Sequence, residues 1–166
     1  MFKVSFKDSE GCKAVTVQHF NNKETVVQLR GIMPLPSFWF SIPSNIRDWV
    51  FEHPSIDTYE SIVRAELIIK SFGKAICADG DTFDAKMGER IAESKAKIRL
   101  YKFMHTLCKK LIYCYHGYIY GVPEGRGTCK TATLSDYHGG LQDACRKYAE
   151  LWVKESRHLG ILLSEE

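Results

Sequence analysis

The sequence lacks the features that mark a membrane or secreted protein. It contains no run of about 18 apolar residues, the length that a membrane-spanning helix requires. Its first residues, MFKVSFKDSEG, hold neither a long apolar core nor a small-residue cleavage site, so we expect no signal peptide. We therefore predict a cytoplasmic protein without membrane contact, whose six cysteines are reduced thiols.

A large net charge is also missing. The formal net charge is +3, from 23 basic and 20 acidic side chains. This small value argues against an acidic mimic of DNA and against a strongly basic coat protein, but it leaves room for a local basic patch. The 166 residues, of which 45% are hydrophobic, otherwise suit one soluble globular domain.

No recognisable metal site or catalytic set is present. The cysteines lie far apart with no C-x-x-C pair, so a structural zinc site is not expected. Cys114 and His116 could share one face of a strand, yet their spacing to Cys129, His138 or Cys145 matches no known zinc pattern. The sequence also does not show which histidine would lie near which cysteine. We predict no catalytic residue, no metal and no cofactor, and hence a protein that is not an enzyme.

One stretch, GVPEGRGTCKTATL, approaches a nucleotide-binding loop. Gly125, four residues and then Cys129-Lys130-Thr131 differ by one position from the phosphate-binding pattern G-x-x-x-x-G-K-[ST]. The position before the lysine must be glycine for the backbone to wrap closely around phosphate. The following ATLSDYHGG is also unlike the start of a helix. We predict a glycine-rich loop that binds neither ATP nor GTP, with Arg126 and Lys130 as exposed contacts for an acidic partner.

Residues 1–42 alternate between apolar and polar side chains, which predicts a β-meander. Asn21-Asn22 separates KAVTVQHF from TVVQLR and is a hairpin signal. FWFSI is the last expected strand of the meander, and Ser44 is the expected cap of a short helix, NIRDWVFE. Residues 58–72 fit either a helix that ends at Gly73 or a hairpin that turns around Ser71 to Gly73. We prefer the hairpin because Ile and Val dominate there.

Two long helices are expected in the second half of the chain. Asp84 is the predicted N-cap of the first helix, which carries an apolar stripe and forms a strand–strand–helix element over residues 62–110. We predict a strand over LIYCYHGYIYG, then a loop, and then a last helix that begins at Ser135 or Asp136 and ends at Gly160. The apolar stripe of this last helix consists of Leu141, Cys145, Tyr148 and Trp152. The fold class is α+β, a single domain with a mainly antiparallel sheet and two long helices.

The first long helix carries an unbalanced stripe of basic residues. Lys95, Arg99, Lys102 and Lys109 share one face, and no acidic residue follows Glu93 before the helix ends. Such a stripe suits contact with phosphates, and nearby tyrosines offer stacking surfaces. A solvated face of an amphipathic helix is the alternative interpretation. The candidate binding residues are Lys95, Arg99, Lys102, Lys109, Tyr113, Tyr115, Arg126 and Lys130.

Residues 72–103 resemble a box found in small proteins of phages and other mobile elements. The box runs roughly G-K-A-x-C, D-T-F-D and G-x-x-I-A-x-x-K-A, and the matching residues here are Gly73-Lys74-Ala75, Cys77, Asp81 to Asp84, Gly88, Ile91-Ala92 and Lys95-Ala96. IVRAEL together with the helix IAESKAKIRL is also similar to the strand–strand–helix element of phage single-strand annealing proteins.

This resemblance implies a small effector protein that acts in the cytoplasm of a host cell. The function that we expect from it is binding and inhibition of a host defence complex, as an anti-CRISPR protein acting on a CRISPR effector nuclease or its guide RNA. The alternative is a phage accessory protein that binds DNA or RNA during replication or recombination. The basic stripe fits either hypothesis.

Overall fold

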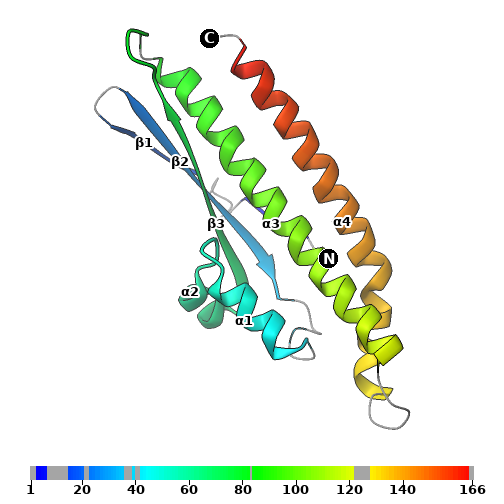
Figure 1. Ribbon diagram of the computed structural model, residues 1–166. Coiled ribbons are helices and arrows are strands. Elements are labelled where there is room, and N and C mark those ends of the chain that lie inside the picture. Colours follow the sequence, from blue (N-terminus) through cyan, green and yellow to red (C-terminus); the bar gives the residue numbers. More distant parts are fainter. Residues whose placement is uncertain are drawn as a thin grey trace.

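The computed structural model describes residues 3–6, 15–20, 23–35, 39, 42–82, 84–121 and 128–164, and it gives side-chain surroundings for all of these except 114–121 and 128–137. These residues form a single α+β domain with one antiparallel sheet and two long helices, as the sequence predicted (Figure 1). Within the described ranges, no helix is long and apolar enough to cross a membrane.

The sheet has the strand order β1-β2-β3, with β1 at Val15–Phe20, β2 at Glu24–Pro34 and β3 at Glu66–Ile76. The predicted β1–β2 hairpin is confirmed, because Phe20 pairs with Glu24 and the backbone N–H of Lys23 donates to Phe20 O at 3.0 Å. The rest of the meander differs from the prediction. Ser5 forms only an isolated bridge to Ile32, and Trp39 packs in the core outside the sheet.

The predicted hairpin that turns around Ser71 to Gly73 is wrong. Helix α2, Thr58–Arg64, begins after Asp57, whose side chain accepts a hydrogen bond from the backbone N–H of Glu60. The helix ends at Ala65, which has a left-handed backbone with φ 53°. Strand β3 then runs straight through Ser71 and Gly73, so the glycine is not a turn residue.

The predicted start of helix α3, Ala85–Gly121, is confirmed. Asp84 Oδ1 accepts hydrogen bonds from the backbone N–H groups of Lys86 and Met87, at 2.8 and 3.1 Å. The strand predicted over residues 111–121 is wrong, because the helix continues to Gly121. Leu107 and Leu111 are both buried, so the apolar stripe continues at helical spacing and overrides the strand preference of the tyrosines.

The other two helices also differ from the prediction at their ends. Helix α4, Thr128–Leu162, begins before Ser135 and continues through Gly160. Its predicted stripe does face the core, with Leu141 and Tyr148 buried. Helix α1, Ser44–Glu52, follows Pro43 and has no side-chain cap, so Ser44 is not the capping residue.

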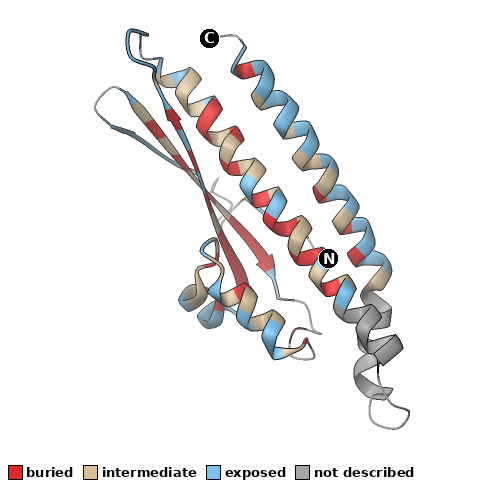
Figure 2. Ribbon diagram, in the orientation of Figure 1, coloured by how far each residue is buried: buried red, intermediate tan, exposed pale blue. Residues whose placement is uncertain are grey.

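Helix α3 lies between the sheet and α4, and α4 runs antiparallel beside it (Figure 1). The buried residues follow α3 and the strands beneath it (Figure 2). One core cluster joins α1, α4 and the C-terminal part of α3, where Trp49 stacks on Phe103 at a ring distance of 5.9 Å. A second cluster joins the sheet, the N-terminal part of α3 and the end of α4 through Val27, Ala92 and Leu162.

Candidate nucleic-acid interface

Gly73, Ala92 and Ala96, three residues of the G-K-A-x-C to G-x-x-I-A-x-x-K-A pattern, form the junction at which α3 packs against β3. A Cβ atom on Gly73 would lie 1.8 Å from Ala92 O and 2.7 Å from Ala96 N, so only glycine allows the two backbones to come this close. Ala92 and Ala96 are fully buried at the contact. Ser71 Oγ donates to Ala96 O at 2.7 Å, which fixes the register of the helix on the strand.

The remaining residues of the box support the same junction. A Cβ atom on Gly88 would lie 2.7 Å from Thr25 Oγ1, so α3 also packs closely on β2. Cys77 Sγ lies 3.5 Å from Asp81 O in the loop between β3 and α3. With Asp84 as the cap of α3, most of the box is accounted for by packing and capping. The resemblance thus describes a folding unit and does not by itself mark a binding site.

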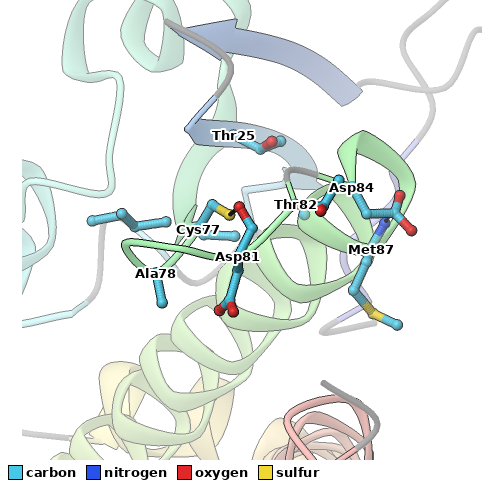
Figure 3. Close-up of a pocket in the computed structure, with 10 residues that line it drawn as sticks. Thr25, Cys77, Ala78, Asp81, Thr82, Asp84 and Met87 are labelled. Atoms are coloured by element: carbon cyan, nitrogen blue, oxygen red, sulfur yellow. Dashed lines mark hydrogen bonds between the residues drawn. The ribbon is translucent and has the colours of Figure 1, made fainter.

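A cavity of about 340 Å³ lies beside this junction, at the open end of the sheet. Its polar lining includes Thr25, Cys77, Asp81 and Asp84 (Figure 3). The carboxylates of Asp81 and Asp84 point away from one another, so they do not form a pair suited to acid–base catalysis. Among the described residues, no group of three or more His, Cys, Asp or Glu side chains is placed to hold a metal ion.

One chain of polar contacts beside the cavity has the composition of a catalytic triad. His19 Nδ1 lies 3.0 Å from Thr25 Oγ1, and His19 Nε2 lies 3.1 Å from Glu89 Oε1. Thr25 borders the cavity near the hairpin end of β2, but it is fully buried beneath Gly88 of α3, and a nucleophile must reach its substrate. Asp84 also occupies the first backbone N–H groups of α3, which would otherwise be available to an oxyanion. We assign His19 a structural role in joining β1 to α3.

The basic stripe lies at the surface of α3, with Lys95 half-buried and the other three exposed, and we call Lys95, Arg99, Lys102 and Lys109 the basic ridge. None of the four has an ion-pair partner among the described residues. Lys97 on the neighbouring face, in contrast, pairs with Glu93 at 3.0 Å. The ridge therefore presents cationic charge that the described part of the chain does not neutralise.

Two residues of the ridge reach the free edge of β3. Lys95 Nζ donates to Lys74 O at 3.0 Å, and Arg99 Nη1 donates to Phe72 O at 2.7 Å. A lysine has three donors and an arginine has five, so each side chain keeps N–H groups for a second partner. These bonds hold the two cations beside the sheet, where a ligand on the sheet could reach them.

The other two residues of the ridge lie further along the helix. Lys102 Nζ lies 5.7 Å from the centre of the Trp152 ring on α4, in a cation–π contact. Lys109 lines a shallow hollow with Ile46, Lys110 and Tyr113. Lys110 Nζ lies 4.6 Å from the centre of the Trp49 ring, so its charge is held over an aromatic face.

Five of the eight predicted contact residues lie on one exposed face of α3. Tyr113 joins the ridge there and is 82% exposed, although it stands on a helix and not on the predicted strand. The side chain of Tyr115 lies outside the described side chains. Arg126 lies outside the described residues altogether, and Lys130 is placed only as a backbone position in α4.

The glycine-rich loop differs from its prediction in one respect. Helix α4 begins at Thr128, so Lys130 and Thr131 lie in a first helical turn, where the sequence predicted no helix. Residues 122–127 lie outside the described residues. Cys129 still stands where a phosphate-binding loop has glycine, and the absence of ATP or GTP binding stays a prediction.

Helix α2 presents an apolar surface that its sequence pattern does not indicate. Tyr59, Ile62 and Val63 are 82, 65 and 68% exposed, whereas Ser61 is buried and accepts a hydrogen bond from the backbone N–H of Ile68 at 2.9 Å. The polar side of this helix thus faces the protein and its apolar side faces solvent. Clusters of exposed apolar side chains often mark contact surfaces. We call these three residues the α2 patch.

Searches of protein-family models, of curated proteins and of solved structures found no match to this chain. The resemblance to mobile-element proteins, the anti-CRISPR hypothesis and the expectation of a non-enzyme therefore stay predictions. The structure is an α+β domain with a row of four basic residues on one face of α3.

Proposed function

We propose that this protein binds nucleic acid through the basic ridge, as an accessory protein and not as an enzyme. The observation that carries the proposal is the row of four cations without acidic partners among the described residues. They lie on one face of a helix that packs against both the sheet and α4, so the helix backbone sets their order and spacing. Cations in a row suit the regularly spaced phosphates of DNA or RNA.

A charge-neutral variant of the ridge tests this proposal. In Lys95→Gln, Arg99→Gln, Lys102→Gln three positive charges are lost while the side chains stay polar, and the β3 carbonyls released by Lys95 and Arg99 lie at a free edge where water can bind them. Binding to labelled DNA and RNA oligonucleotides is measured by fluorescence anisotropy at low salt. The matched control removes three exposed cations from α4, in Lys147→Gln, Lys154→Gln, Arg157→Gln.

The ridge variant is expected to lose most of its affinity, while the α4 control keeps it, although both variants lose the same net charge. Equal loss in both variants would mean that overall charge and not the ridge attracts the nucleic acid. Absence of binding by the wild-type protein to every oligonucleotide would overturn the proposal.

A second candidate function is inhibition of a host defence complex, such as a CRISPR effector nuclease. The α2 patch favours it, because exposed clusters of apolar side chains often mark contact surfaces and an exposed tyrosine is a common anchor for a protein partner. Expression in a cell with active CRISPR interference should then restore plasmid transformation, and Ile62→Ser with Val63→Ser should abolish the effect. Unchanged interference across several effector types would contradict this role.

A further inference from the structure

One face of the sheet is covered by α3. On the opposite face, the described helices leave uncovered the half that lies towards the β1–β2 hairpin. Side chains at odd-numbered positions of β2 and β3, such as Val27, Leu29 and Ala75, are buried beneath α3. Because side chains alternate along a strand, the even-numbered positions point to the opposite face. Figure 1 shows α3 and α4 on the same side of the sheet, and α2 at the end where β3 begins.

Helix α2 covers only one end of this opposite face. It is fastened there by ion pairs from Glu60 to Arg30 and from Asp57 to Lys70. Towards the β1–β2 hairpin, the same face has three more cross-strand rows of side chains, and no described helix covers them. We call these three rows the open face. The rows are Thr16–Gln28–Phe72, Gln18–Val26–Lys74 and Phe20–Glu24–Ile76.

The open face displays aromatic rings between polar side chains. Phe20 and Phe72 are 46 and 44% exposed, and Ile76 is 66% exposed. The two phenylalanines stand on the two outer strands, four residues apart in register. By strand geometry they are separated by about 13 Å along the strands and about 10 Å across them. The two phenylalanine rings thus offer two separate flat surfaces to a ligand, and amide and hydroxyl side chains surround them.

The cationic edge of the sheet runs beside these rings. Arg99 donates a hydrogen bond to the carbonyl of Phe72 itself. Lys95 donates to the carbonyl of Lys74, which lies two residues further along the same strand edge. Lys74 adds a third cation on the open face, where Glu24 pairs with it at 2.6 Å. Phosphates held at this edge would place the attached bases over the open face. The first two cations of the basic ridge, Lys95 and Arg99, therefore adjoin the aromatic rings and form one surface with them.

We infer that the open face is a stacking platform for single-stranded nucleic acid, with Phe20 and Phe72 each stacking on one base. This inference rests on the proposed function and narrows it to single strands. A duplex keeps its base faces inside the helix, so it can use the basic ridge but not the two rings. A single strand can use both, because every base has a free face for an aromatic side chain.

The test compares a labelled oligothymidine, an oligouridine and a DNA duplex on the full-length protein. The variant Phe20→Leu, Phe72→Leu keeps apolar side chains on the strands but removes the rings. Tyr59→Leu removes an exposed aromatic ring from α2 and is the matched control. Each lost stack should weaken single-strand binding about five- to 150-fold, the range measured for base–aromatic stacking. Duplex binding and the response to salt should stay as in the wild type.

Phe20→Tyr, Phe72→Tyr restores a ring at each position and should restore single-strand affinity, which separates stacking from any change in folding. Single-strand binding that is unaffected by the leucine variant, or a duplex that binds as tightly as the single strand, would overturn the inference and leave the basic ridge as a phosphate site. Loss of affinity in the Tyr59→Leu control to the same degree would also overturn it. No binding of any oligonucleotide by the wild type would instead refute the proposed function itself.

Discussion

Replacing Gly73 by alanine should destabilise the protein more than any surface substitution. The added Cβ atom would lie 1.8 Å from Ala92 O, whereas ordinary contact begins near 3.4 Å. The overlap of about 1.6 Å is with backbone, which no side-chain rotation can relieve, so α3 must move off β3. That movement would open the fully buried contacts of Ala92 and Ala96. We expect a loss of at least about 3 kcal/mol, the upper end for overpacking in a core.

A loss of this size is a large part of a typical unfolding free energy of about 5–15 kcal/mol. For a domain of this length it lowers the melting temperature by roughly 6–12 °C, which thermal denaturation followed by circular dichroism measures directly. Gly140→Ala is the matched control, because nothing lies within 4 Å of its added Cβ in α4. Alanine there should stabilise the helix by about 0.5–1 kcal/mol. A Gly73→Ala protein that melts with the wild type would refute the account of the box as a close-packed junction.

Three further predictions concern stability. Asp84→Ala should lower the unfolding free energy by about 1 kcal/mol in urea titration, because α3 loses its N-cap, and an equal loss in Asp84→Asn would argue against capping. Ala65→Gly should raise the unfolding free energy by about 1 kcal/mol, because glycine adopts the left-handed backbone of this position without strain. A decrease in the unfolding free energy would contradict this explanation. Burial raises the pKa of Tyr148 to about 12, which favours the neutral phenol in the folded state. This stabilisation is complete below the unfolded pKa of about 10 and is lost as the pH rises towards 12, so Tyr148→Phe should flatten the alkaline loss of stability.

Local sequence patterns predict correctly those parts of the fold that are determined by residues close together in the chain. The β1–β2 hairpin and the start of α3 at Asp84 follow from turn and cap chemistry within a few residues. The basic ridge follows from helical spacing alone. The strand predicted over residues 111–121 failed because its tyrosines favour strands only weakly, while the buried Leu111 extends the helical stripe.

Other features depend on contacts between distant segments and could not be predicted. The sequence around Gly73 suggests a turn, because the residue that requires glycine there, Ala92, lies on a separate helix. The alternation of β1 and β3 shows that each strand has two faces, but not that the described helices leave the face with Phe20 and Phe72 uncovered. The α2 patch was missed for a related reason, since apolar residues at helical spacing are normally expected to face the core.

The salt dependence of binding tests the role of the basic ridge most directly. Affinity for a single-stranded oligonucleotide is measured over a series of salt concentrations, and log affinity is plotted against log salt. Each phosphate contact contributes about 0.7 to the slope for single strands, so Lys95→Gln, Arg99→Gln, Lys102→Gln should reduce its magnitude by about 2. The α4 control, with the same net charge, should keep the wild-type slope. If the folded ridge variant keeps that slope as well, the ridge does not contact phosphates, and the central claim is contradicted.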